Sequence, residues 1–568
     1  MTATVAGGPT ADPTGPTGST AAAPGQPVWI TKLTADEVAD LAAAAPDGPL
    51  TGLRFAIKDN LDLAGHPTTA GYPGLARLPA LTSAVAVRRL MRAGAVPVGK
   101  TNMDQFATGL VGTRTPYGAC HSVASAAHVS GGSSSGSAVA VAAGLVPLAL
   151  GTDTAGSGRV PAAFNGIVGI KPTRGLVSTR GLLPACRSLD CVTTFTRTVA
   201  EGRAALDVLA WADPDDPWSR ARPPAPAGIA ARMRVVGVPA GAIDLDPEHL
   251  LAWTAALSRL AGVAARVVPV DVGAFLEAAR LLYGGPWIAE RWAAFGGHLA
   301  GGDPTLDPIV RQIVTAGRDV GGPAVFAALD RLATLRRRTE LIWPDVDALL
   351  LPVTPGHPRH REVAADPVGV NTRLGTYTNF ANLLDLCAVA VPAGRRPDGL
   401  PFGVQFVAPA FADAALLDLA DRWCGSAPAP TRLAAATLPP GTTLLAVAGA
   451  HLSGLPLNPQ LTELGGRLYA RARTAGGYRL YRLPGPGVPR PGLVYTGDGP
   501  AGGIAVEVWQ VPHHAVGVLL DTLAVPLGLG RVELDDGSVV AGFLAAQHGV
   551  RDATDVSDAG GWRAVIAG

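Results

Sequence analysis

Residues 130–162 read SGGSSSGSAVAVAAGLVPLALGTDTAGSGRVPA, and the rest of the chain is organised around them. Two loops of small residues, 131–137 and 151–158, enclose an apolar segment. The segment predicts a closely packed helix over 138–145 and a short buried strand over 146–150. Few Cβ atoms in such loops obstruct a ligand, so backbone N–H groups can approach a substrate closely.

Ser157 lies between two glycines in the second loop, where N–H groups can face a developing oxyanion. A nucleophilic serine needs a base, and no histidine lies near it in the sequence. Upstream, an apolar strand predicted over 54–57 delivers Lys58 at its end. A lysine that is desolvated there can lose its proton near neutral pH and act as a general base. Glycine- and serine-rich loops are often only linkers, but the flanking apolar runs argue against that interpretation.

Three separate pieces in the right order resemble the amidase signature family: Lys58 in AIKDN, Ser133 in GGSSSGSA and Ser157 in GTDTAGSGRVPA. The resemblance covers about residues 51–427 and implies an α/β fold with a large mixed sheet flanked by helices. It also implies a Ser–cis-Ser–Lys triad, in which Ser157 is the nucleophile, Ser133 the proton relay and Lys58 the base. The oxyanion hole would then be formed by the backbone N–H groups of Thr154, Ala155 and Gly156.

Charged residues near these motifs are predicted to be structural. Asp153 and Arg159 flank the nucleophile loop, and we expect them to form a buried ion pair that braces it. A carboxylate beside Lys58 would raise its pKa, so we expect Asp59 to point away from the site. Lys171, in the following strand and turn, is also interpreted as structural.

Residues 280–291 read RLLYGGPWIAER, with Tyr283 and Arg291 in an otherwise apolar stretch. Pro286 prevents one continuous helix, so the two side chains are expected to come from a turn and from a helix start. An arginine in a cleft binds a carboxylate through two hydrogen bonds, and a tyrosine hydroxyl can add a third. Taken alone, the motif is equally consistent with an arginine that pairs with a surface glutamate.

The YGGPWIAER stretch together with TAGSGR resembles the allophanate hydrolases within that family. The resemblance implies a small anionic amide as substrate, with Tyr283 and Arg291 on its carboxylate. Ser157 would release ammonia, and the product N-carboxycarbamate would decarboxylate onward. No metal or organic cofactor is implied. The alternative within enzymes is a general amidase, or a subunit of an amidotransferase, that works on another small amide. A scaffold with a relic triad is disfavoured because all three triad positions are filled.

The sequence predicts a flexible tail over 1–27, a first domain over 28–427, a Pro-rich linker over 428–442 and a second domain over 443–568. The second domain is β-rich α+β and resembles the allophanate hydrolase carboxy-terminal domain, which is related in fold to γ-glutamyl cyclotransferases.

His451, at the end of a predicted strand in the second domain, is the candidate for assisting decarboxylation of the first product. His513 and His514 are weaker candidates. Two alternatives stay open. The histidine could be merely hydrogen-bonded, or the domain could only support dimerisation or contacts with other enzymes of the pathway.

Composition narrows the function further. The net charge is +1, which gives no indication of nucleic acid or of an anionic membrane surface as a partner. No apolar run is long enough to span a bilayer. Five scattered cysteines lack metal-site spacing and indicate reduced thiols in the cytoplasm. The family resemblance implies a homodimer.

Two local patterns complete the prediction. Residues 29–45 are expected to form a helix, with Thr34 and Glu37 as a capping box. Asp536–Gly537 predicts a hairpin turn within the strand region 531–543.

Overall fold

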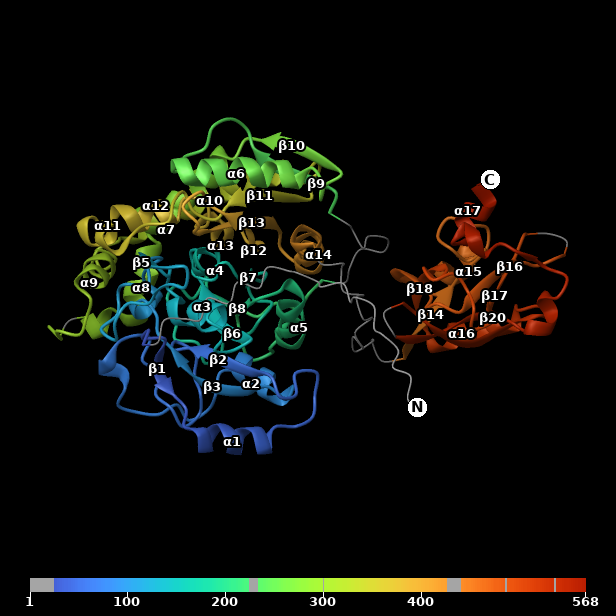
Figure 1. The fold of residues 1–568 in the computed structure, drawn as a ribbon, viewed down its shortest axis with the longest axis horizontal. Helices are drawn as coiled ribbons and strands as arrows, with labels where there is room; N and C mark the ends of the chain where they lie inside the picture. Colours follow the sequence, from blue (N-terminus) through green and yellow to red (C-terminus); the bar gives the residue numbers. More distant parts are fainter. Residues whose placement is uncertain are drawn as a thin grey trace, which may run out of the picture. The chain divides into compact units, whose positions relative to one another are not determined.

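The computed structural model describes residues 25–223, 233–299, 301–425, 441–485, 488–535 and 538–567. They form two compact units, which divide at residue 425 (Figure 1). Most of the predicted tail and linker, and the predicted turn at Asp536–Gly537, lie outside the described residues.

A sheet of eleven strands crosses the described part of the first unit (Figure 1). Its order is β1 (Trp29–Lys32), β3 (Val96–Thr101), β2 (Arg54–Lys58), β6 (Leu148–Asp153), β8 (Cys191–Thr196), β7 (Val168–Lys171), β12 (Leu386–Arg395), β13 (Pro401–Pro409), β11 (Ala348–Pro352), β9 (Val235–Pro239) and β10 (Arg266–Val270). β2 pairs in parallel with both β3 and β6, whereas β12 pairs antiparallel with β7 and β13. The mixed sheet predicted from the sequence is therefore confirmed.

Helices cover both faces of this sheet, and the strands alternate accordingly. Phe55 and Ile57 of β2 belong to one core cluster, while Ala56 between them belongs to another on the opposite face. The first face packs against α2 (Val85–Arg92), α5 (Val199–Leu209), α6 (Pro247–Leu260) and α14 (Asp413–Cys424). The opposite face packs against α3 (Ser135–Ala142), α4 (Val160–Asn165), α7 (Gly273–Gly284), α10 (Gly322–Glu340) and α13 (Phe380–Leu383).

Residues 130–162 form α3, β6, the loops beside them and the start of α4. The helix begins at Ser135, three residues before the predicted start, because the small serines and Gly136 pack against their surroundings without obstruction. The strand covers 148–153 rather than 146–150, so it continues to Asp153 at the edge of the nucleophile loop. Both elements are almost entirely buried.

The predicted helix over 29–45 is only partly correct. Residues 29–32 form the edge strand β1, which pairs antiparallel with β3 far along the chain. The helix proper, α1, covers Ala35–Ala44, and its capping box between Thr34 and Glu37 is confirmed. The edge strand was missed because its pairing is not local, whereas a capping box is visible in the sequence.

The remaining described elements lie in loops and at the edges of the first unit. They are β4 (His121–Ser122), β5 (Ser125–Val129), α8 (Trp287–Phe295), α9 (Pro308–Thr315), α11 (His360–Ala365), α12 (Gly369–Leu374) and the short 3-10 segments Pro73–Leu75, Gln105–Ala107 and Gly296–Leu299. Among the described residues, none of the helices combines the length and the apolar character that a membrane span requires.

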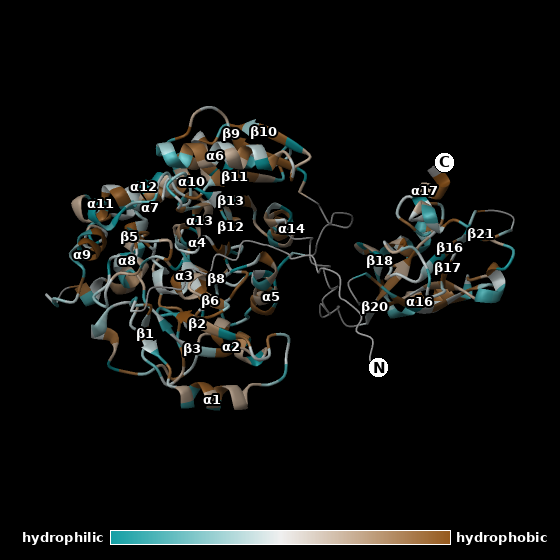
Figure 2. Cartoon of the chain, viewed as in Figure 1, coloured by the Kyte–Doolittle hydropathy of each residue, from teal (hydrophilic) through white to brown (hydrophobic). Residues whose placement is uncertain are grey.

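The second unit is built on a five-stranded sheet with the order β15 (Arg467–Arg473), β18 (Ala505–Pro512), β14 (Thr442–Val447), β20 (Val539–Ala545) and β19 (Leu527–Glu533). A smaller sheet contains β17 (Pro491–Tyr495), β16 (Tyr478–Arg482) and β21 (Thr554–Asp555). Its helices are α15 (Asn458–Glu463), α16 (His513–Asp521) and α17 (Trp562–Ala567), with 3-10 segments at Gln547–Val550 and Ser557–Ala559. The hydropathy colouring in Figure 2 shows apolar and polar residues interspersed along these strands, as expected for sheets with one buried face.

Candidate active site

Lys58 and Ser133 meet at the carboxyl end of β2. The lysine Nζ lies 2.7 Å from Ser133 Oγ and 2.8 Å from Thr152 Oγ1 on the neighbouring strand β6. All three side chains are buried. The peptide bond between Gly132 and Ser133 is cis, as the family resemblance implies. Two of the three predicted triad members are thus in hydrogen-bond contact.

Burial lowers the pKa of Lys58 to about 7. Buried aspartates act in the opposite direction, and the guanidinium of Arg291 lowers the value further. Asp59 points away, as predicted: its carboxylate lies 3.1 Å from Lys100 Nζ and accepts the Thr69 amide. Burial thus brings the pKa of Lys58 into the neutral range, where its free amine becomes available as a general base.

The loop that carries Ser133 is held against β6 by its neighbouring serines. The Ser134 hydroxyl donates to the carbonyl oxygen of Thr152, and the Ser137 hydroxyl donates to that of Leu150. Because Thr152 also contacts Lys58, the loop and the lysine are fixed to the same strand.

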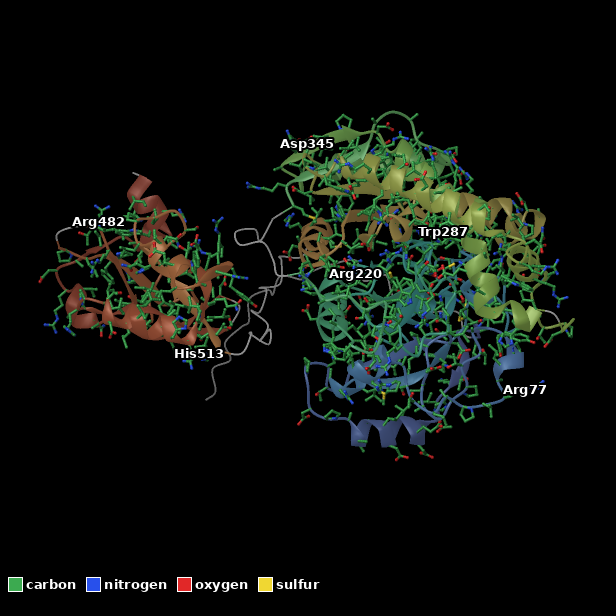
Figure 3. The ribbon with its side chains drawn as sticks, turned by 180° about the vertical axis from the view of Figure 1, so that it is seen from behind. Arg77, Arg220, Trp287, Asp345, Arg482 and His513 are labelled. Atoms are coloured by element: carbon green, nitrogen blue, oxygen red, sulfur yellow. The ribbon has the colours of Figure 1, made fainter. Side chains whose placement is uncertain are left out.

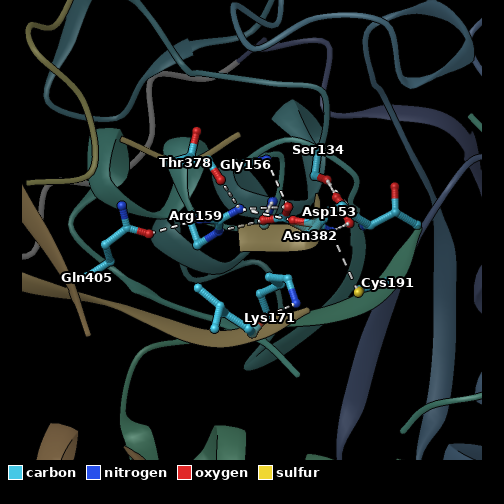
Figure 4. Close-up of polar contacts among 12 residues, drawn as sticks. Ser134, Asp153, Gly156, Arg159, Lys171, Cys191, Thr378, Asn382 and Gln405 are labelled. Carbon is cyan, nitrogen blue, oxygen red and sulfur yellow. Dashed lines mark hydrogen bonds and ion pairs between the residues drawn. The ribbon is translucent and has the colours of Figure 1, made fainter. Parts of the chain in front are cut away.

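Ser157 lies in the turn between β6 and α4, almost fully buried. The Asp153 carboxylate shapes this turn by accepting the amides of Gly156 and Gly158, at 2.8 and 3.0 Å. Arg159 pairs with the same carboxylate at 2.9 Å, so the predicted buried ion pair is present. Figure 4 shows this network, in which Arg159 also donates to the side chain of Gln405.

One of the three predicted oxyanion-hole donors, the Gly156 amide, already has a hydrogen-bond acceptor. Thr154, Ala155 and Gly156 all lie in the turn before Ser157, but the Gly156 N–H is already donated to Asp153. In this structure it is therefore not a free donor for a substrate oxygen. The reason is that the carboxylate predicted to brace the loop does so through this amide.

Tyr283 and Arg291 approach each other from two helices. Tyr283 is the penultimate residue of α7, and Arg291 lies in the middle of α8, which begins at Trp287, labelled in Figure 3. The prediction that they come from a turn and from a helix start is therefore wrong, because both helices extend farther toward Pro286 than expected. The break at Pro286 is as predicted. The Arg291 guanidinium lies 3.3 Å from the Tyr283 hydroxyl and 5.3 Å from the centre of its ring.

Arg291 is 1% exposed, so it is not the surface arginine of the alternative interpretation. Its hydrogen bonds in the described parts of the chain go only to neutral groups: the Thr108 hydroxyl at 2.9 Å, the Ala107 carbonyl and Tyr283. The charges of Asp190 and Glu290 act on Arg291 as well, but neither carboxylate forms a hydrogen bond with it. A buried guanidinium without a direct carboxylate partner is costly unless a ligand supplies the anion.

Lys171 is structural, as predicted, because its ammonium group donates to the carbonyl oxygens of Pro172 and Leu386. Asp190 was missed. It accepts the Thr154 hydroxyl and the Ala185 amide, and burial raises its pKa to about 6. Nothing in its local sequence, RSLDCV, marks it, because folding alone brings it to the nucleophile loop.

In the second unit, His451 follows β14 and lines a pocket. Its Nε2 lies 2.9 Å from Gln460 Oε1, and its ring stacks on Phe543 with a centroid distance of 5.1 Å. Arg490 and Thr522 also line the pocket. Burial lowers the pKa of His451. His513 and His514 are exposed at the start of α16 and do not line this pocket.

Comparison with known proteins assigns both units to families. Residues 29–417 match the family described as Amidase, and residues 443–567 match the allophanate hydrolase C-terminal domain. One component of the glutamyl-tRNA(Gln) amidotransferase of Natronomonas pharaonis is 35% identical over 403 residues, which are 65% of this chain and 95% of that protein.

Two relatives align with both units. The urea amidolyase of Saccharomyces cerevisiae is 40% identical over 541 residues, 91% of this chain, and the chain spans only 29% of that protein's length. The structure of Kluyveromyces lactis allophanate hydrolase is 38% identical with a TM-score of 0.73, covering 96% of this chain and 94% of that one. The chain therefore belongs to the amidase family and carries, after its amidase domain, a domain of the allophanate hydrolase C-terminal family.

Proposed function

We propose that this chain hydrolyses allophanate at its terminal amide, releasing ammonia and N-carboxycarbamate. The observation that carries the proposal is the buried Arg291, which lacks a carboxylate partner among the described residues and is close enough for its charge to lower the pKa of Lys58. Allophanate offers a carboxylate for this arginine and an amide for a serine nucleophile. The similarity to urea amidolyases and to an allophanate hydrolase supports this substrate.

In the proposed reaction, neutral Lys58 takes a proton from Ser133, which takes one from Ser157. The Ser157 oxygen attacks the amide carbon, and the oxyanion is stabilised by the backbone N–H groups of Thr154 and Ala155. The carbon–nitrogen bond breaks, and ammonia leaves with a proton returned through Ser133. Water then attacks the acyl-enzyme by the same route and frees N-carboxycarbamate. Lys58 suits this role because it is buried and bonded to Ser133.

Selectivity would arise from Arg291 and Tyr283 holding the substrate carboxylate. A neutral amide of the same shape would leave the buried guanidinium without an anion and would bind less well. This preference separates the proposal from a general amidase or an amidotransferase subunit that acts on an amide without a carboxylate, because the loss of Arg291 would then do no harm.

For the second unit we propose that the His451 pocket promotes loss of carbon dioxide from N-carboxycarbamate. As the bond between nitrogen and the departing carboxyl carbon breaks, its electron pair stays on nitrogen. The nitrogen then takes up a proton supplied through His451. Two residues that line the same pocket support this proposal. Arg490 can attract the anionic product, and His451 can supply a proton to it. Substitution of His451 with Asn should leave the release of the first ammonia unchanged and slow the release of carbon dioxide.

We also propose that the chain works in the cytoplasm as a homodimer. All five cysteines are free, which fits a reducing compartment. Phe326 and Leu329 on α10 are exposed apolar residues that a second copy could cover. Sedimentation equilibrium on the full chain tests the dimer.

The decisive experiment measures ammonia release by the purified full chain. The substrates are allophanate, its methylene analogue malonamate, and their neutral counterparts biuret and malonamide, each with wild type and Arg291→Ala. The proposal expects wild type to prefer the carboxylate-bearing member of each pair, and Arg291→Ala to lose mainly that preference. If the neutral amides react as well as the anionic ones, the serine chemistry stands and the substrate assignment is wrong.

A further inference from the structure

Residues 104–108 link the loop of Ser133 to the arginine. At one end, the Asp104 amide donates to the Ser133 carbonyl oxygen at 3.1 Å. At the other, the Thr108 hydroxyl accepts from Arg291 Nη1 at 2.9 Å. Phe106 and Ala107 between them both have positive φ, 48° and 52°, although neither is glycine. Such backbone costs free energy and persists only where the surroundings enforce it.

This segment is rigidly held. The Asp104 carboxylate accepts the amides of Gly112 and Arg114, and the Gln105 side chain donates to the carbonyl oxygens of Gly71 and Thr305. The ring of Phe106 stacks on Phe295, which lies on α8 with Arg291, at a centroid distance of 4.4 Å. Thr108 and Arg291 are therefore presented to each other by parts of the fold that have little freedom to move.

The donor and acceptor roles of the Thr108 hydroxyl are both fixed by its hydrogen bonds. It donates to the Phe106 carbonyl oxygen at 3.2 Å, so a lone pair is left to accept from the guanidinium. Thr108 is fully buried, and its carbonyl oxygen accepts from Arg114 at 2.8 Å. The hydroxyl thus holds Nη1 of the guanidinium, while Nη2 donates to the Tyr283 hydroxyl.

We propose that Thr108 is the positioning residue that sets selectivity for a carboxylate-bearing amide, by fixing the orientation of Arg291. The inference rests on the proposed function, because it assumes that Arg291 binds the substrate carboxylate. Thr108 itself need not contact the substrate. Its loss should weaken the contact between Arg291 and the substrate carboxylate. That contact is equally strong in the ground state and in the transition state, so KM should change and kcat should not.

The test compares Thr108→Val, which keeps the shape and removes the acceptor, with Thr108→Ser, which keeps the hydroxyl. The matched control is Thr194→Val, because Thr194 is buried on β8 and its hydroxyl has no hydrogen-bond partner among the described residues. For each full-chain variant, kcat and KM are measured with malonamate and malonamide, and Ki is measured for malonate, which binds without being an amide.

A hydrogen bond to a buried charged group predicts a rise in KM for malonamate and in Ki for malonate of roughly 10- to 100-fold in Thr108→Val. Values of kcat, and turnover of malonamide, should stay within about threefold. Thr108→Ser should restore most of the affinity, and Thr194→Val should resemble wild type.

Two results would overturn the inference. If Arg291→Ala abolishes the preference for malonamate and Thr108→Val does not weaken it, Thr108 has no such role while the proposed function stands. If wild type itself shows no preference for malonamate over malonamide, the proposed function fails and the role of Thr108 fails with it.

Discussion

The substitution Asn60→Asp tests whether Lys58 works as a neutral base. Asn60 Nδ2 and Lys58 Nζ share one partner, Thr152 Oγ1, at 3.2 and 2.8 Å. The distance between the two nitrogen atoms is therefore at most the sum of these two hydrogen-bond distances. Asn60 is buried, so a carboxylate at this position would act on the lysine with little screening.

The expected size of the effect follows from this separation. Two unit charges about 6 Å apart, at an effective dielectric constant of about 20, interact by about 2.8 kcal/mol, which is about two pKa units. Since the pKa of Lys58 is about 7, that of the variant should lie near 9. A general base must be deprotonated, so at pH 7 the variant should lose roughly 50-fold in kcat/KM and recover near pH 10.

The assay is a pH profile of kcat/KM for ammonia release from malonamate, from pH 5.5 to 10. Asn60→Ala is the control, because it removes the bond to Thr152 without adding charge, and its acid limb should stay near that of wild type. If folded Asn60→Asp shows the same acid limb as both other enzymes, the activity does not depend on the protonation of Lys58.

Three further substitutions test separate parts of the site. Arg159→Met leaves Asp153 buried without its partner and should cost about 3–5 kcal/mol of unfolding free energy in urea, whereas Arg318→Met, at an exposed ion pair, should change it little. Gly156→Ala would put a Cβ 2.4 Å from Thr378 Oγ1 at a φ of +136° and should lower kcat by roughly 100-fold. The control Gly144→Ala, whose Cβ would have no atom within 4 Å, should leave kcat unchanged. An active Gly156→Ala would contradict the tight packing of the turn around Ser157. Tyr283→Phe removes one hydroxyl next to Arg291 and should raise KM for malonamate by roughly 3- to 10-fold with little change for malonamide.

The sequence predicted the parts of the site that local chemistry marks. We could recognise Lys58 because it lies at the end of an apolar strand, where burial restricts its chemistry. We could recognise Asp153 and Arg159 around Ser157 because opposite charges at short spacing favour an ion pair. Tyr283 and Arg291 were found as polar residues in an apolar stretch. Only the structure shows that Arg291 is buried, which excludes a pairing with a glutamate at the surface.

What the sequence missed depends on contacts between distant segments. Thr108 lies 183 positions from Arg291, and Thr152 lies 94 positions from Lys58. A single threonine in an ordinary context carries no signal of either contact. The edge strand β1 was lost for the same reason, since it is defined by its pairing with β3. Local pattern identifies the groups that do chemistry, and only tertiary packing identifies those that orient them.

The charges around Lys58 connect substrate choice with pH dependence. Burial lowers the pKa of Lys58, and so does the positive charge of Arg291. The pKa is raised by the negative charges of Asp104, Asp190 and Asp153. A substrate carboxylate bound to Arg291 would offset that positive charge, so the pKa of Lys58 should rise when an anionic substrate binds. A neutral amide would leave it unchanged. The acid limb of kcat, which reports the enzyme–substrate complex, should therefore lie above that of kcat/KM for malonamate and coincide with it for malonamide. Under the proposed function, Arg291 would in this way both select the substrate and set the lowest pH at which the bound substrate turns over.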